Sequence, residues 1–423
     1  MTPATLHRLA SPNGFSLEVP DGLREVPERE DGSVCLVAEA DPWSFPRTFR
    51  PNLTATVAPL APERSTVPQL SALTIAAQLE LGVHVAACDV WPEPGGADGR
   101  RISSLYPAMD TTVVQQQYVA IRGGRAVCVS VQCGADRLPY ADLVFRHAVA
   151  TIRCDFADPV PEPDPETMPR LDAFAAERGL ELEDLGRVRA AQPFVSAGPV
   201  LEEEQIEALR RGKLRRGIDP APLQTAGFID ADGRLTEMAE TAHQALRSPV
   251  RQVQIEVTSD EGNRDAVLRA YQRRDATAVV ANAPPGRSGD GYTLDVIASE
   301  TTPVALARWL GLAPAWTFAL DDDSPDLELD GAVVEARLAG VEAPAPAHAS
   351  TALRRMWSQP WQVARLGSDR PDASVTTVIS TPEAGTFRLK RDRGAGAASL
   401  TPLPSHSYLL ELLELAGFGV TAA

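Results

Sequence analysis

The sequence predicts an α+β protein built from two domains that are joined by a linker. Its 423 residues exceed the size at which one hydrophobic core usually keeps growing. Short runs with alternating apolar side chains, typical of antiparallel strands, occur in both halves and are separated by a few helical patterns. Residues 158–169 read DPVPEPDPETMP, with five prolines and four acidic residues, which indicates an extended spacer. We therefore expect an N-terminal domain over 1–157, a linker over 158–169 and a C-terminal domain over 170–423.

The N-terminal domain is predicted to be an antiparallel sheet with two principal helices. Valine-rich segments flank Gly123-Gly124, and a Gly-Gly pair suits the primed turn of a tight hairpin. Pro68 near its start and Gly82 at its end mark the first helix. The expected strands are 15–19, 34–38, 53–60, 83–90, 100–106, 113–121 and 126–131. The expected helices are 67–81 and 140–152.

Three stretches of this domain resemble a known family. They are NGFSLEVPDGL at 13–23, FRPNLTATVAPL at 49–60 and QQQYVAIRGGRAVCVSV at 115–131, and they are similar to LpqN/LpqT-type actinobacterial proteins. For most of residues 10–157 the resemblance implies a PsbP-like fold with α/β/α layers. It also implies binding of a ligand or a protein rather than catalysis.

The C-terminal domain contains a turn, helix and strand series over 227–252. The residues from Asp230 to Gly233 have the composition of a tight turn in which Gly233 takes a positive φ. Thr236 is the expected N-cap of the helix that follows. Pro249 ends this helix, because proline cannot continue the hydrogen-bond ladder, and strand-like alternation follows. The series is thus the expected entry to a sheet.

The same order of elements recurs later in the chain, which predicts a duplicated domain. Both copies, about 234–312 and 348–418, have a helix, a proline, four strand candidates and a second helix. Pro249 and Pro360 lie 111 positions apart, whereas the closing helices lie about 106 apart. The expected strands are 252–257, 266–272, 277–282 and 292–298, then 361–366, 374–380, 386–390 and 399–403. This order predicts a pseudo-twofold antiparallel sheet with packed helices; chance similarity of two ordinary meanders is the alternative.

The turn AGFIDADG at 226–233, the helix before Pro249 and the duplicated units resemble the EspG family of type VII (ESX) secretion-associated proteins. The resemblance spans roughly residues 170–423. It implies a pseudo-twofold α/β fold. It also implies a cytoplasmic chaperone that binds the helical tip of PE/PPE-type substrates, shields its apolar surface and helps direct it to a secretion system.

Composition narrows the possible partners and the compartment. The net charge of −17 disfavours nucleic acid and anionic membranes, both of which require basic patches. No window approaches the roughly 20 apolar residues of a transmembrane helix. Residues 1–11 lack the apolar core of a signal peptide, so we expect a cytoplasmic location without membrane insertion. The five cysteines are expected to be reduced core thiols, because their number is odd and no short paired spacing occurs.

Motifs for catalysis or metal binding are incomplete. The run GRSGD at 286–290 fails at the last position of the G-x-S-x-G motif. The turn at 230–233 resembles part of a calcium loop, but the first and twelfth ligand positions would be Phe228 and Ala239. Residues 321–323 could bind a divalent ion, although a solvated acidic loop is favoured. We therefore expect no enzyme activity, no cofactor and no metal site.

The strongest binding candidates lie in the repeated half. Residues 283–291, APPGRSGDG, form a long connection between two expected strands, and such a loop could hold a partner or be a plain surface loop. Most tryptophans of this half are expected in the core, yet one near a loop could anchor an interface. The candidate protein-binding residues are Pro284, Pro285, Arg287, Asp290 and Trp316.

The functional hypothesis is a cytoplasmic, non-enzymatic chaperone or adaptor for helical secreted proteins of an actinobacterial type VII system. Two alternatives stay open at this stage. One is a small-molecule-binding or ligand-binding module centred on the PsbP-like domain. The other is an enzyme without a recognisable motif, which would need a cleft with clustered titratable side chains.

Overall fold

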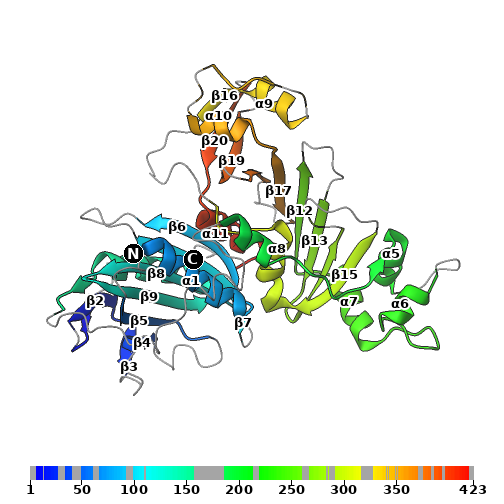
Figure 1. Ribbon diagram of the computed structural model, residues 1–423. Helices are drawn as coiled ribbons and strands as arrows, with labels where there is room; N and C mark the ends of the chain where they lie inside the picture. The colour runs from blue at the N-terminus through cyan, green and yellow to red at the C-terminus, as the bar shows by residue number, and fades with distance from the viewer. Residues whose placement is uncertain are drawn as a thin grey trace. The chain divides into compact units, whose positions relative to one another are not determined.

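The computed structural model divides the chain into two compact units, each of which is described by itself (Figure 1). The first unit comprises Met1–Gln192 with Leu409–Glu414 and Phe418–Ala423, and the second comprises Pro193–Tyr408 with Leu415–Gly417. The structure describes residues 6–12, 14–26, 34–40, 49–60, 66–91, 99–108, 111–156, 185–212, 219–259, 266–282, 284, 291–315, 327–339, 341, 343–347, 349, 351–369, 375–382, 385–392 and 396–418. The predicted linker, 158–169, lies outside these residues.

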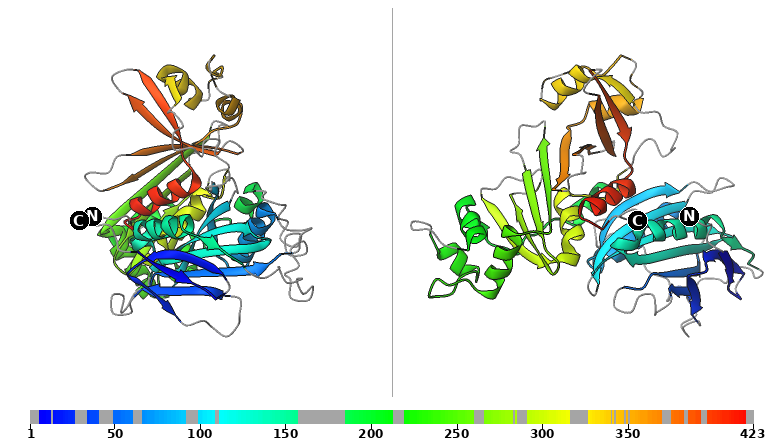
Figure 2. Two further views of the ribbon diagram at one scale, coloured as in Figure 1. Left: turned by 90° about the vertical axis from the view of Figure 1, so that its left-hand side faces the viewer. Right: turned by 180° about the vertical axis from the view of Figure 1, so that it is seen from behind.

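The first unit contains a seven-stranded antiparallel sheet in the order β3-β4-β5-β9-β8-β7-β6. Figures 1 and 2 show helices α1 and α2 on opposite faces of this sheet. The strands are β3 (Leu23–Val26), β4 (Val34–Ala40), β5 (Asn52–Pro59), β6 (His84–Trp91), β7 (Gly99–Ala108), β8 (Thr111–Arg122) and β9 (Arg125–Gly134). A smaller sheet joins β1 (Leu6–Ala10), β2 (Phe15–Pro20) and β10 (Arg153–Cys154). The helices are α1 (Val67–Glu80), the short 3-10 helix η2 (Ala135–Arg137), α2 (Leu138–Ala150) and α4 (Leu185–Ala191).

Short sequence patterns explain the main hairpin and the start of the first helix in this unit. Gly123 and Gly124 have φ values of 53° and 71°, so the predicted primed hairpin between β8 and β9 is confirmed. Thr66 and Gln69 form a capping box that starts α1. Strands β1, β3 and β10 were not predicted, because they are short and only a minority of their residues are buried.

Helix α4 packs in the first unit, although the sequence places residues after 169 in the second domain. Val188 is buried, and Gln192 follows the helix. The side-chain amide of Gln192 donates to the Val85 carbonyl at 2.7 Å and accepts from the Val85 N–H at 2.9 Å. Strand β6 is an edge strand whose register shifts at Val85, so this amide completes the backbone pairing there.

The second unit contains a ten-stranded sheet in the order β11-β15-β14-β13-β12-β17-β18-β19-β20-β16, and every pairing is antiparallel. The strands of its first half are β11 (Val200–Leu201), β12 (Arg251–Ser259), β13 (Ala266–Gln272), β14 (Ala276–Ala281) and β15 (Tyr292–Ala298). Those of its second half are β16 (Leu327–Asp330), β17 (Gln362–Ser368), β18 (Thr376–Thr381), β19 (Gly385–Asp392) and β20 (Ala397–Pro402). With the first unit, this sheet confirms the predicted α+β class with antiparallel sheets.

The strand order reads alike from both ends, with β12 and β17 as the central pair. Ile255 is the sixth residue after Pro249, and Leu366 is the sixth residue after Pro360. These two residues face each other across the β12–β17 pairing. A local twofold axis through this pair therefore relates one copy of the sequence repeat to the other. The offset between the copies falls along the repeat mainly because the β19–β20 connection, 393–396, is shorter than the β14–β15 connection, 282–291.

Helices precede and follow each four-stranded meander (Figure 1). They are α5 (Glu203–Arg211), α6 (Ala221–Thr225), α7 (Glu237–Arg247), the 3-10 helix η3 (Ser299–Thr301), α8 (Thr302–Leu310), α9 (Gly331–Leu338), α10 (Thr351–Trp357) and α11 (Ser405–Leu415). Thr236 caps α7 as predicted, and its hydroxyl accepts from the Ala239 N–H. Strand β16 and helix α9 were not predicted, because both are short.

Candidate functional site

The structure describes only one of the five predicted binding residues, Pro284. Pro284 lies just beyond β14 and is partly buried. Pro285, Arg287, Asp290 and Trp316 lie outside the residues that the structure describes. The prediction that these five residues bind a partner therefore stays a prediction.

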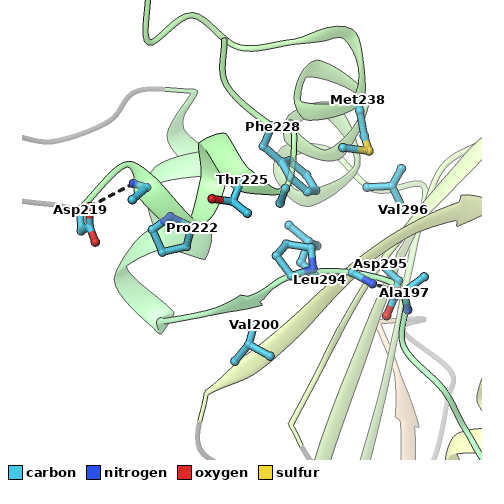
Figure 3. A pocket seen from close by; sticks show the side chains of 14 residues that line it. Ala197, Val200, Asp219, Pro222, Thr225, Phe228, Met238, Leu294, Asp295 and Val296 are labelled. Carbon is cyan, nitrogen blue, oxygen red and sulfur yellow. Dashed lines mark hydrogen bonds between the residues drawn. The ribbon is translucent and has the colours of Figure 1, made fainter. Parts of the chain in front are cut away.

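An open apolar groove of about 690 Å³ lies instead at the β11–β15 edge of the second unit (Figure 3). One wall is formed by α6 and the start of α7, and the other by residues 197–200 and strand β15. Ala221, Ala226 and Pro222 on the helical wall are small or compact, which leaves the space between the walls open. Sequence patterns did not reveal this groove, because its walls come from segments that are far apart in the chain.

Phe228 lies at the inner end of the groove and is 1% exposed. The turn around it is fixed by the backbone: the Phe228 N–H donates to the Leu223 carbonyl at 2.8 Å. The Thr236 hydroxyl donates to the Gly227 carbonyl at 2.7 Å, and Gly227 has a φ of 74°, which glycine adopts without strain. The turn and helix that the sequence predicts at 227–247 thus form one wall of the groove.

Asp295 holds the opposite wall in place. Its carboxylate accepts hydrogen bonds from the Ser196 hydroxyl at 2.6 Å, the Ala197 N–H at 2.9 Å and the Gly198 N–H at 2.8 Å. A Cβ atom on Gly198 would lie 2.0 Å from the carbonyl oxygen of Leu294, so no side chain fits at this position. Hydrogen bonds to a carboxylate are stronger than neutral ones, and together they fix residues 196–198 against β15.

The rim of the groove exposes large apolar side chains. Val200 is 60% exposed and Met238 is 40% exposed, and both line the groove. Methionine is unbranched and flexible, so it adapts to apolar groups of different shape. The lining carboxylates, Asp219 and Asp295, both accept backbone hydrogen bonds. The groove therefore has the chemistry of a binding surface for apolar groups rather than that of a proton-transfer site.

A second hollow of about 430 Å³ lies over the central strand pair β12–β17, and most of the residues that line it are polar or charged. Gln254 donates from Nε2 to Glu256 Oε1 at 2.6 Å, and Arg365 is the cross-strand neighbour of Glu256. Asp369 accepts from the Gln252 N–H at 3.0 Å. This hollow brings side chains of both charges together, whereas most residues that line the groove are uncharged.

The thiols that the structure describes lie in the first unit. Cys88, Cys128, Cys133 and Cys154 are free thiols. Burial of the thiol raises the pKa of Cys128 to about 12, although part of the residue is exposed, and burial also raises the pKa of Cys133.

Within the described ranges, no three His, Cys, Asp or Glu side chains converge in a way that could hold a metal ion. No helix in that part of the chain is long and apolar enough to span a membrane.

No protein-family model matches the chain, and no curated protein matches it. Three of the solved structures that match are each similar to about a third of it. A cyanobacterial PsbP from Synechocystis sp. PCC 6803 is similar at 11% identity with a TM-score of 0.29, over 36% of this chain and 93% of its own. The Saccharomyces cerevisiae Ran-binding protein Mog1p is similar at 11% identity with a TM-score of 0.26, over 35% of this chain and 95% of its own.

LpqN of Mycobacterium tuberculosis, a protein involved in cell envelope biogenesis, is similar at 15% identity with a TM-score of 0.24. That similarity covers 35% of this chain and 91% of LpqN. PsbP and LpqN structures are thus among those that resemble this chain, as the N-terminal sequence predicts. At such low scores they carry no argument about activity or partner, and the EspG resemblance receives no support from these comparisons.

Proposed function

We propose that the chain is a cytoplasmic, non-enzymatic chaperone or adaptor for helical secretion substrates, PE/PPE-like or related, of an actinobacterial type VII system. In this proposal the second unit is an EspG-like domain. The sequence resemblance at 226–233 and the order of the duplicated units support it. The partner's helical tip binds in the groove beside α6 and α7.

The open apolar groove is the observation that carries the proposal. A soluble protein that exposes Val200 and Met238 beside an unfilled apolar hollow gains stability when a partner covers them. Full burial of one leucine or phenylalanine side chain stabilises a complex by about 1.5–3 kcal/mol. A groove of about 690 Å³ has room for more than one such side chain.

The chemistry of a helical tip suits this groove. Residues at the end of an amphipathic helix present apolar side chains that would aggregate in water. The groove offers apolar contacts from Val200, Val296 and Met238 on both walls. The net charge of −17 keeps the complex soluble while these groups are covered.

Co-expression tests the proposal directly. The tagged full-length chain is expressed with PE/PPE-like proteins of an actinobacterial type VII system and purified under native conditions. We expect at least one such protein to copurify in stoichiometric amount. The Ala221→Trp variant places an indole in the groove wall and is expected to abolish copurification.

The matched control is Ala150→Trp, because Ala150 is an exposed alanine at the end of α2 in the first unit. This variant is expected to retain the partner. If no secretion substrate copurifies with the wild type, the chaperone function is wrong. If Ala221→Trp retains its partner as well as the control does, the groove is not the binding site.

A further inference from the structure

The three-stranded sheet of the first unit has a free edge at strand β1. This strand pairs with β2 from Leu6 to Ala10 in a continuous register, and no strand pairs with its other side among the described residues. The opposite side of β2 is covered, because β10 pairs with it there and the Glu18 N–H donates to the Thr151 hydroxyl at 2.9 Å. Strand β10 has only two residues, so the main free edge of this sheet is that of β1.

The hydrogen-bond pattern shows which backbone groups of β1 point to the free edge. In an antiparallel pair, residues that bond to the neighbouring strand alternate with residues that point away from it. The Ser11 N–H donates to the Phe15 carbonyl at 2.8 Å, so every second residue counted back from Ser11 bonds to β2. The N–H and C=O groups of the residues between them, Leu6, Arg8 and Ala10, therefore point outward.

These outward groups have no hydrogen-bond partner among the described residues. Leu6 is 41% exposed, and Arg8 and Ala10 are exposed as well. The register partner of Arg8 is Glu18, whose N–H bonds to Thr151 rather than to β1, as the alternation requires. An exposed row of backbone donors and acceptors is a template for a further strand.

The side chains of β1 leave this edge accessible. The strand contains no proline and no bulge, which are two devices that protect sheet edges. The Arg8 guanidinium donates to the Ser16 hydroxyl at 3.0 Å and to Glu18 Oε1 at 2.7 Å, so it lies over β2. His7 Nδ1 lies 3.4 Å from Oδ1 of Asp21, in the turn after β2. Both side chains thus point away from the free edge.

The sheet face that carries Arg8 has more positive than negative charge. Its charged strand residues are Arg8, Glu18 and Arg153. Arg153 is exposed, and Glu18 is bonded to Arg8. A guanidinium has five N–H donors, so Arg8 can bind a second carboxylate beside Glu18. This face therefore favours an acidic partner over a basic one.

We infer that the free edge of β1 binds an extended peptide segment with an acidic residue opposite Arg8. The peptide backbone pairs with the outward N–H and C=O groups of Leu6, Arg8 and Ala10, as strands add to exposed sheet edges elsewhere. Its carboxylate lies beside the Arg8 guanidinium, and its apolar side chains two residues to either side lie opposite Leu6 and Ala10. This inference goes beyond the proposed chaperone function and does not depend on it.

A second copy of the chain fits this edge less well. Only one antiparallel register pairs all five residues of two β1 strands, and it sets the two Arg8 side chains opposite each other. Like charges directly opposite in a sheet are destabilising. The charge of Arg8 thus selects a different chain as the partner.

Fluorescence anisotropy with the full-length chain tests the inference. The probe is a capped, labelled synthetic peptide with the core VTETV, whose valines and glutamate share one face of an extended strand. We expect saturable binding, and we expect a peptide with the core VTKTV to bind about tenfold more weakly. Methylation of the glutamate backbone nitrogen removes the central hydrogen bond of the pairing. It should weaken binding about tenfold while the protein stays unchanged.

Three protein variants locate the site. Arg8→Gln should bind VTETV about tenfold more weakly and lose the preference over VTKTV. Ala10→Pro removes an outward N–H without a β1–β2 bond and should abolish binding, with circular dichroism as the check on folding. Arg24→Gln is the matched control, because Arg24 is an exposed arginine of the edge strand β3, and it should bind as the wild type does.

Four results would overturn the inference. They are no binding of VTETV at millimolar peptide, equal binding of the methylated peptide, and an equal loss with Arg24→Gln and Arg8→Gln. The fourth is self-association of the wild type that Ala10→Pro abolishes, because the occupant of the edge would then be a second copy.

Discussion

The two halves of the ten-stranded sheet share their strand order but differ in what covers them. In the first half, α7 packs on the sheet with three fully buried alanines, Ala239, Ala242 and Ala245. In the second half, α10 and the following residues bring Trp357 and Trp361 into the core. These two indole rings meet edge to face, with centroids 5.0 Å apart.

The volume of these side chains accounts for the difference between the halves. The second-half core also contains Met356, Phe387 and Leu389, so large groups fill the space under α9 and α10. In the first half the small side chains of α6 and α7 leave the groove beside Phe228 and Met238. The two halves thus have the same strand order. The size of their side chains decides whether the space beside the helices is a filled core or an open groove.

Trp361→Ala is expected to have the largest effect on stability. Trp361 is 1% exposed, and its indole N–H donates to the Met356 carbonyl at 3.2 Å. Removal of a buried aromatic ring costs about 3–5 kcal/mol. Denaturant unfolding followed by far-UV circular dichroism measures this change. A loss below about 1 kcal/mol would contradict a filled second half.

Asp295→Ala is expected to loosen the groove wall of the first half. The variant removes the acceptor of three hydrogen bonds to residues 196–198. Because hydrogen bonds to charged groups contribute about 1.5–3 kcal/mol, we expect a destabilisation of about 2 kcal/mol. Hydrogen exchange at Ala197 and Gly198 should accelerate. Asp232→Ala, at an exposed turn residue, serves as the control, and equal exchange in both variants would contradict the role of Asp295.

His243→Ala is expected to have a moderate effect within the first half. The buried imidazole lies with Nδ1 at 2.8 Å from the Leu209 carbonyl, which links α7 to the end of α5. Loss of this contact leaves a buried carbonyl without that partner and costs about 1–2 kcal/mol. The thermal unfolding midpoint should fall, whereas the exchange of Ala197 and Gly198 should not change. A midpoint equal to that of the wild type would show that the link contributes nothing.

Met238→Ala is expected to have the smallest effect on stability and a clear effect on binding. Met238 is 40% exposed, so its truncation should change the free energy of unfolding by about 0.5 kcal/mol or less. A partner that buries this side chain should bind roughly tenfold more weakly, because about 1.4 kcal/mol corresponds to a factor of ten. Titration with a copurified secretion substrate measures it. Unchanged affinity would remove Met238 from the binding surface.

The sequence predicts the repeated sheet well because its signals are local. Alternating apolar residues mark β13 and β15, and Pro249 marks the end of α7. The Thr236 cap likewise depends on residues within one turn. Such patterns fix element type and order before any long-range contact forms.

The groove could not be predicted in the same way. It depends on the approach of residues 197–200, 221–228 and 294–296, which sequence spacing does not reveal. The one local sign is Gly198, whose close approach to Leu294 excludes a side chain. The pairing of Gln192 with Val85 was missed for the same reason, because the two residues are distant in sequence. Side-chain links between distant segments need the structure.

In the proposed function, the first half of the repeated sheet binds a helical partner through its groove. Hydrogen exchange of the full-length chain, with and without a copurified PE/PPE-like protein, tests it most directly. We expect added protection at 197–201 and 221–238, with no change at α9 and α10. Protection at α9 and α10 without protection at the groove would contradict it.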